Sequence, residues 1–147
     1  MVELGDISKK LKILSLKRGS VFRMELFPQD GVTPKNKGDK SRTKYFVVLG
    51  IDGNKVSVCS TLINSEINPK RYNWIGPYQY LISASKYNFL EHKDRYVDCY
   101  QYIDLKYDKI LDKAEYIGII DEEDIVEIIK LLKSAPLINN EIERYNL

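Results

Sequence analysis

The chain of 147 residues has the size of one domain, and its 44% hydrophobic and 30% charged residues are typical of a folded protein, not a disordered one. A net charge of +2, from 23 basic and 21 acidic side chains, argues against a protein that coats duplex DNA by charge alone. The single histidine, His92, argues against a zinc site and a Ser-His-Asp triad, so we expect neither a metal nor a cofactor.

The two cysteines and the first residues indicate the compartment. Cys59 and Cys99 stand in apolar, strand-like runs without a close partner, which predicts small buried residues and no disulfide. A charged and not an apolar stretch follows residues 1–6, so we expect no signal peptide, and no apolar run approaches the about 20 residues of a membrane helix. We therefore expect a cytoplasmic protein without a membrane segment. Eleven tyrosines favour a β-rich fold.

The first third of the chain predicts a helix, a strand and a loop. Residues 6–16 predict a short basic helix, because apolar side chains recur on one helical face at Ile7, Leu11 and Leu14. Residues 21–27 predict a strand. Residues 28–44 predict a long loop rich in proline, glycine and lysine. Loops longer than about 12–15 residues are usually functional or mobile, and we expect mobility at 29–42.

A hairpin is the clearest local feature of the N-terminal half. Residues 45–51 and 55–60 predict two strands, and Asp52-Gly53-Asn54 predicts the tight turn between them. Antiparallel pairing across such a turn would bring Tyr45 opposite Ser60, at the end of the hairpin farthest from the turn.

The following residues predict an irregular segment and then further strands. Residues 63–76 are irregular and contain the only tryptophan, Trp74. Strands are predicted at 78–82, 95–103 and 116–120, and a helical turn at 105–111. If the strand at 95–103 is regular, three of its tyrosines share one face, which would be a stacking surface or simply one side of a sheet. These tyrosines are Tyr96, Tyr100 and Tyr102.

The best predicted helix spans residues 121–134. Asp121 is a suitable N-cap, and acidic residues in the first turn and lysines in the last turn match the helix dipole. Apolar residues at i, i+3, i+4 and i+7 predict one buried face. Pro136 ends the helix, and the tail after it is either a short helix or disordered. The predicted buried face consists of Ile125, Ile128, Ile129 and Leu132.

In this order of elements, several motifs resemble the MazF/PemK-type toxin family. Arg95-Tyr-Val-Asp-Cys-Tyr-Gln-Tyr-Ile-Asp resembles a strand of that family, and Lys109-Ile-Leu resembles the short helix that follows it. Tyr116-Ile-Gly-Ile-Ile-Asp-Glu-Glu-Asp-Ile resembles the family's "Ile-Gly-x-Leu" strand and acidic-capped terminal helix. Arg18-Gly-Ser-Val-Phe is similar to its opening "Arg-Gly-Asp-Ile" strand. Lys44-Tyr-Phe-Val-Val-Leu is similar to its "Arg-Pro-x-Val-Val-Leu" strand, although the Arg-Pro dipeptide is absent.

The resemblance implies a mainly β fold over a single domain, residues 1–147. That fold is a small SH3-like, curled and partly open antiparallel barrel with a C-terminal α-helix, usually in a homodimer. The core would span about 18–134, with an N-terminal extension at 1–17, a tail at 135–147 and added loops at 29–42 and 65–90. The implied function is metal-independent endoribonuclease cleavage of single-stranded RNA in a toxin–antitoxin or mobile-element system, with an antitoxin protein as partner.

The resemblance also implies the site residues. It places the family's catalytic arginine at Lys44, with Arg42 on the same strand face, and its catalytic hydroxyl at Ser60 or Thr61. A fixed cation would stabilise the phosphorane while the hydroxyl orients the phosphate. Lysine lacks the bidentate fork of arginine, so the replacement is not conservative. Candidate RNA-binding residues are Arg23, Lys35, Lys37, Lys40, Trp74, Asp98 and Gln101.

Two other functions stay open. One is a catalytically silent binding domain with the same barrel, which the missing Arg-Pro dipeptide favours. The other is a protein-targeting toxin of the gyrase-poisoning kind, whose aromatic-Gly-Ile ending residues 145–147 do not provide. The four candidate catalytic residues are otherwise ordinary polar residues at strand ends, and Trp74 is either a core residue or a platform for a base.

Overall fold

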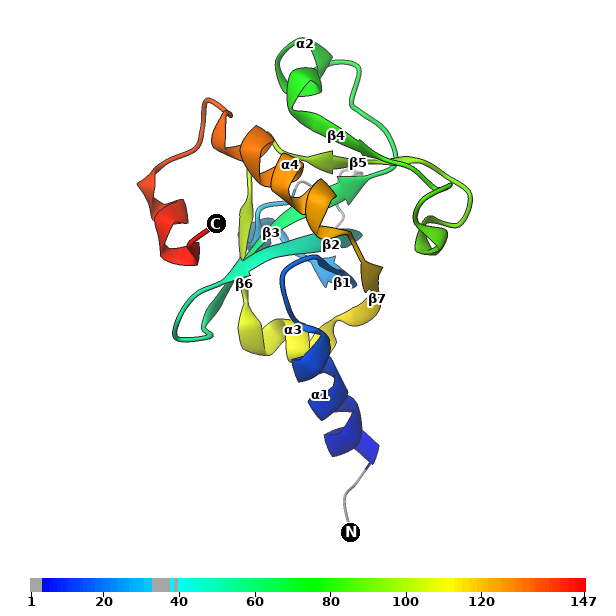
Figure 1. Ribbon diagram of the computed structural model, residues 1–147, viewed down its shortest axis with the longest axis vertical. Helices are drawn as coiled ribbons and strands as arrows, with labels where there is room; N and C mark the ends of the chain where they lie inside the picture. The colour runs from blue at the N-terminus through cyan, green and yellow to red at the C-terminus, as the bar shows by residue number, and fades with distance from the viewer. Residues whose placement is uncertain (1–3, 33–37, 39) are drawn as a thin grey trace.

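The computed structural model describes residues 4–32, 38 and 40–147, and a single antiparallel sheet is its central element (Figure 1). The strands are β1 (Ser20–Leu26), β2 (Arg42–Ile51), β3 (Ser57–Asn64), β4 (Gln79–Ile82), β5 (Arg95–Asp98), β6 (Ile103–Lys106) and β7 (Glu115–Ile119). The helices are α1 (Leu4–Ser15), α2 (Tyr72–Ile75), α3 (Tyr107–Lys113) and α4 (Glu122–Lys133). Short 3-10 turns occupy Pro28–Asp30, Gly76–Tyr78, Asn88–Leu90 and Asn140–Tyr145.

The strand order is β4-β5-β3-β2-β1-β7, and every pair is antiparallel. β3 lies at the centre because its first residues pair with β6 and its last two pair with β5. The sheet is curled but not closed, since β4 and β7 end this path without pairing with each other. The predicted mainly antiparallel β fold with a C-terminal helix is confirmed.

The two faces of the sheet are covered by two apolar clusters. Alternate residues of β2 point to opposite faces, so that Val47 and Leu49 join one cluster while Phe46 and Val48 join the other. The first cluster lies between the sheet and α4, which crosses it (Figure 1). The predicted apolar stripe of α4 is buried at all four positions, as expected for a helix that closes a core.

The C-terminal tail packs against the body of the protein. Ile142 and Tyr145 are buried in the first cluster, and the Tyr145 hydroxyl donates a hydrogen bond to Asp104. A Cβ atom at Gly50 would lie only 2.7 Å from Cδ2 of Leu147, so glycine permits this close approach. Of the two alternatives for the tail, the structure has the short helix, a 3-10 helix at Asn140–Tyr145.

The predicted strand at 95–103 is confirmed as β5 at 95–98 but is wrong at 99–102, because the chain leaves the sheet after Asp98. Asp98 Oδ1 accepts a hydrogen bond from the Tyr100 backbone N–H at 3.0 Å, which forms a local turn. The chain then re-enters the sheet as β6, so the three tyrosines do not share a face. Tyr100 packs on Tyr78 with ring centroids 5.7 Å apart, and Tyr102 packs edge-on against a ring of the tail.

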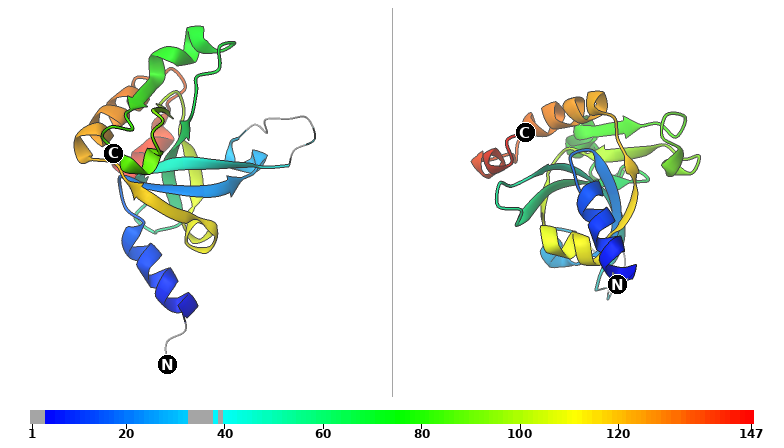
Figure 2. Two further views of the ribbon diagram at one scale, coloured as in Figure 1. Left: turned by 90° about the vertical axis from the view of Figure 1, so that its right-hand side faces the viewer. Right: turned by 60° about the horizontal axis from the view of Figure 1, so that its bottom comes forward.

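The N-terminal helix is confirmed, but its apolar side is not part of the core. The exposed fractions of Ile7, Leu11 and Leu14 are 44%, 60% and 74%. Figure 1 and Figure 2 show α1 extending away from the sheet. Lys12 Nζ donates a hydrogen bond to the Leu111 carbonyl oxygen at 3.0 Å, which links α1 to α3. No helix in the described ranges is long and apolar enough to cross a membrane.

The predicted loop at 28–44 is shorter than expected. A 3-10 turn follows β1, Val32 is buried in the second cluster, and β2 begins at Arg42. Residues 33–37 and 39 lie outside the described residues, and with them six of the 14 residues of the segment 29–42, for which we predict mobility. Cys59 and Cys99 are free and buried as predicted, and burial raises the pKa of both thiols.

Candidate functional site

The register of β2 and β3 determines which predicted site residues meet. Tyr45 lies opposite Ile63 and Val48 opposite Ser60, with a bulge between Val48 and Gly50. The predicted pairing of Tyr45 with Ser60 is therefore wrong. The connection between the strands spans residues 52–56 and not three residues, and β3 continues beyond Thr61 to Asn64.

Ser60 and Thr61 consequently lie inside the strand and not at its end. Both are fully buried, and neither hydroxyl has a hydrogen-bond partner among the described residues. By strand alternation Ser60 shares the sheet face of Lys44, whereas Thr61 points to the α4 side. The cation and hydroxyl that were expected at one strand end are thus separated along the hairpin.

Lys44 is the most perturbed polar residue of this region. Its exposed fraction is 8%, and its Nζ donates a hydrogen bond to Asn64 Oδ1. Burial, and then the positive charges of Arg42 and Arg95, lower the Lys44 pKa from 10.5 to about 8, although Asp98 opposes the change. An ammonium group with such a pKa exchanges its proton near neutral pH, which suits acid–base chemistry.

Asp98 extends this site across the sheet. Its Oδ1 accepts hydrogen bonds from Gln79 Nε2, on the neighbouring strand, and from the Tyr100 backbone, each at 3.0 Å. Burial raises the Asp98 pKa, while these bonds and the charges of Arg71 and Lys44 lower it. We call Lys44, Asn64, Asp98 and Gln79 the polar row, which runs over β2, β3, β5 and β4 on one sheet face.

Two arginines, Arg42 and Arg71, lie near the polar row, and a third, Arg95, lies on the opposite face of the sheet. Arg42 is exposed and lies two residues before Lys44, on the same strand face. The Arg95 guanidinium lies over the Tyr45 ring, 5.1 Å from its centroid, and the Arg71 guanidinium lies 6.0 Å from the Trp74 ring centroid. Phosphate oxygens are natural ligands for cations such as Arg42 and Lys44, which share one sheet face.

The other candidate residues fall in different places. Arg23 points to the opposite sheet face from Lys44 and lies 3.8 Å from a Glu115 oxygen, so the structure does not bring it to the polar row. Lys40 and Gln101 are exposed next to strand ends. Trp74 lies on α2 and is 50% exposed, so it is not a core residue. Lys35 and Lys37 lie outside the described residues.

Sequence reasoning included Lys44, Arg42 and Asp98 but missed Asn64 and Gln79. Asn64 was assigned to an irregular segment, and only the extended end of β3 places it beside Lys44. Gln79 follows from the pairing of β4 with β5, a long-range contact for which the sequence offers no signal.

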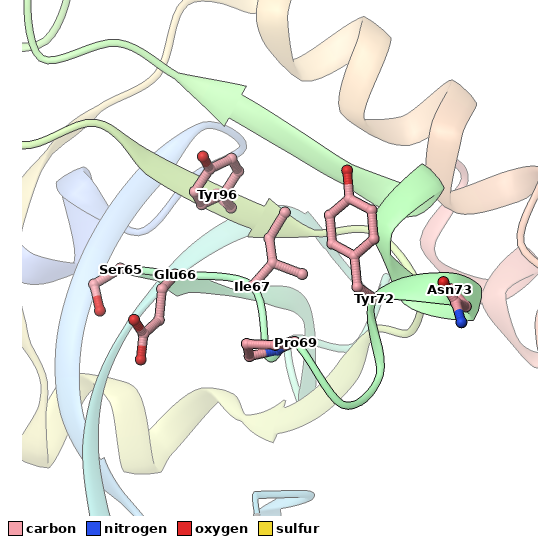
Figure 3. Close-up of a pocket in the computed structure, with 7 residues that line it drawn as sticks. All are labelled: Ser65, Glu66, Ile67, Pro69, Tyr72, Asn73 and Tyr96. Atoms are coloured by element: carbon pink, nitrogen blue, oxygen red, sulfur yellow. The ribbon is translucent and has the colours of Figure 1, made fainter.

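An open pocket of about 570 Å³ adjoins the polar row (Figure 3). It is contiguous with the row because Ser65 follows Asn64 and Tyr96 lies opposite Asn64 in the sheet. Within the described chain, no three His, Cys, Asp or Glu side chains are grouped so that they could hold a metal ion. The polar row thus offers an acid and a base beside an open pocket, and the cation Arg42 lies on the same sheet face.

No family model matches the chain, and no curated protein matches it in sequence. Among solved structures, a chain of the MazE–MazF complex (Form-III) from Deinococcus radiodurans is similar, with a TM-score of 0.54 and 13% sequence identity. The similarity covers 82% of this chain and 94% of that chain. At this identity the likeness concerns the fold alone, and it agrees with the MazF-like fold that the sequence motifs imply.

Proposed function

We propose that this chain is a toxin-like endoribonuclease that cleaves single-stranded RNA without a metal ion. The observation that carries the proposal is the buried Lys44, with its pKa lowered to about 8, beside Arg42 and Asp98. The MazF-like fold supports the proposal, because the resemblance to the MazF/PemK-type family implies this activity.

In the proposed reaction the RNA 2′-oxygen attacks the adjacent phosphorus and the P–O5′ bond breaks, which leaves a 2′,3′-cyclic phosphate and a 5′-hydroxyl. Asp98 accepts the proton of the 2′-hydroxyl, and protonated Lys44 donates a proton to the leaving 5′-oxygen. Arg42 stabilises the negative charge of the phosphorane. The Asp98 carboxyl fits the role of base because its pKa is raised and both of its described hydrogen bonds fall on Oδ1.

The proposal extends to partners. The similar chain from Deinococcus radiodurans belongs to a MazE–MazF complex, and we propose by analogy a protein antitoxin for this chain. A homodimer and a place in a toxin–antitoxin or mobile-element system in the cytoplasm belong to the same proposal. Coexpression of the chain with the product of a neighbouring open reading frame, followed by copurification and a growth assay, tests the antitoxin.

The activity is tested by cleavage of an unstructured RNA in EDTA. The variants are Arg42→Ala, Lys44→Ala, Asp98→Asn and the double variant Ser60→Ala/Thr61→Ala, with Arg23→Ala as a matched control on the opposite sheet face. We expect cyclic phosphate ends and a loss of about 10²-fold or more for Lys44→Ala and Asp98→Asn. The rate should fall as the pH rises through about 8, because Lys44 then loses the proton that it donates. A wild-type protein that cleaves no RNA would refute the proposal.

The burial of Ser60 and Thr61 favours a second candidate, a binding domain without catalysis. In that case Ser60 and Thr61, to whose hydroxyls the resemblance assigns the orientation of the phosphate, are only core residues. Wild-type protein that binds single-stranded RNA, cleaves none of it and does not slow growth on expression would establish this candidate.

A further inference from the structure

The pocket beside the polar row is built for a flat, partly polar ligand. Its volume of about 570 Å³ lies in the usual range for small-ligand sites. Figure 3 shows Ile67 between the rings of Tyr96 and Tyr72, with Glu66 towards one end and Asn73 at the other. Aromatic rings on either side of an aliphatic side chain offer stacking surfaces for a nucleobase.

The Tyr72 ring is held in place although it is 56% exposed. The backbone of Gly76 lies against one side of this ring, because a Cβ atom at Gly76 would be 3.2 Å from both Cδ2 and Cε2 of Tyr72. The preceding turn is closed by hydrogen bonds from the Lys70 and Arg71 backbone N–H groups to the side chain and the carbonyl of Asn68, each at 3.0 Å. A ring fixed in this way loses little conformational entropy when a base stacks on it.

The polar groups of the pocket indicate which base it takes. Among the described residues Glu66 has no ion-pair partner, so no described cation occupies its two acceptor oxygens. Guanine presents N1–H and N2–H side by side on its Watson–Crick edge, which matches one carboxylate, whereas each other base has a single donor group there. A carboxylate also repels phosphate, which leaves the phosphate to Arg42 and Lys44 in the adjoining polar row.

We propose that this pocket binds an unstacked guanine base of single-stranded RNA, with Glu66 reading its Watson–Crick edge and Tyr72 stacking on it. The inference rests on the proposed function, since the pocket adjoins the residues assigned to the scissile phosphate. It adds a base preference for which the catalytic residues give no reason.

Equilibrium binding of non-cleavable RNA tests the inference separately from catalysis. The probes are 2′-O-methyl pentanucleotides UUGUU, UUAUU, UUCUU and UUUUU, whose blocked 2′-oxygens prevent attack on phosphorus. We expect the wild-type chain to bind UUGUU about tenfold more tightly than the other three. Glu66→Gln should reduce that preference to about threefold or less, because glutamine retains one acceptor, while Glu25→Gln on β1 should keep it in full.

The stacking role has its own variants. Tyr72→Ala should weaken the binding of all four probes by about fivefold or more, while Tyr116→Ala, an exposed tyrosine on β7, should not. Gly76 has a helical φ of −53°, so Gly76→Ala disturbs the ring and not the backbone, and it should weaken binding in the same direction.

The outcomes separate the two proposals. Equal binding of the four probes, no binding at all, or a guanine preference that survives Glu66→Gln would overturn the guanine pocket. Guanine-selective binding that depends on Glu66, together with no cleavage of any RNA, would support the pocket and refute the ribonuclease.

Discussion

Two parts of β2, Lys44 near its start and residues 46–49 in its middle, are buried to a similar extent but with different effects on stability. Residues 46–49 are fully buried and apolar, and their alternate side chains enter the two core clusters. Lys44 lies two residues before Phe46 and is 8% exposed, yet its burial lowers its pKa to about 8. Burial therefore stabilises the fold at residues 46–49 and costs free energy at Lys44.

This difference in the effect of burial indicates what Lys44 and residues 46–49 each contribute. A charged group that a fold buries at a cost is often a functional residue, because burial produces the perturbed pKa that catalysis needs. Substitutions in these two parts of β2 should therefore change the free energy of unfolding in opposite directions.

The largest effect is expected in the apolar half of the strand. Phe46→Ala should lower the free energy of unfolding by about 3–5 kcal/mol, because it leaves a cavity in the second cluster and removes the ring stacked 6.0 Å from Phe22. Chemical denaturation measures this change. Val56→Ala, in the exposed connection between β2 and β3, is the control and should stay within about 0.5 kcal/mol. Equal losses for both variants would show that this face is not a packed core.

At the polar end the sign should reverse. Lys44→Met keeps the length of the side chain and removes the buried charge, so the free energy of unfolding should rise by about 1–3 kcal/mol at pH 7 while RNA cleavage is lost. Asn64 is only half-buried and can hydrogen-bond water instead. Arg42→Met, at an exposed position on the same face, should change stability by less than about 0.5 kcal/mol. A destabilised Lys44→Met protein would mean that Lys44 is a favourable structural residue.

The pH dependence sharpens the same contrast. Between pH 8 and 10.5 the unfolded chain binds more protons at Lys44 than the folded chain, so the stability of the wild type rises with pH in this window. The gap in unfolding free energy between Lys44→Met and wild type should be constant below pH 8. Above it the gap should close by at most about 1.4 kcal/mol per pH unit. A gap that stays constant up to pH 10.5, or widens, contradicts a lowered Lys44 pKa.

Local patterns in the sequence predicted the elements of the fold but not all of their connections. The apolar stripe of α4 is a local feature that the structure confirms, and Asp121 occupies the predicted N-cap position, although its side chain makes no capping hydrogen bond. The sequence does not show the break after Asp98, because Asp98 and Tyr100 continue the alternating pattern of the strand into the turn. The hairpin register was missed because Lys55 adopts a left-handed φ of 55° and Asp52 accepts from the Val56 N–H, which lengthens the connection.

The candidate site was predictable only in part, because local patterns do not determine how the strands pair. Arg42, Lys44 and Asp98 are charged residues, which can be selected as candidates from the sequence itself. Their relation to Asn64 and Gln79 depends on which strands pair and in which register, and that is decided by contacts between distant residues. The burial of Ser60 and Thr61 follows from the same register.

The smallest effect is expected at Thr61, where the stability test and the activity test meet. Its Oγ1 is buried without a hydrogen-bond partner among the described residues, so Thr61→Val should raise the free energy of unfolding by about 0.5–1.5 kcal/mol, because valine has the same shape and no polar atom to desolvate. Thr43→Val, exposed on β2, is the control and should be neutral within about 0.5 kcal/mol. If Thr61 is only a core residue, the stabilised variant cleaves RNA at the wild-type rate. A stabilised variant that no longer cleaves RNA would instead show that this hydroxyl reaches the substrate, and that the strand must shift to expose it when RNA binds.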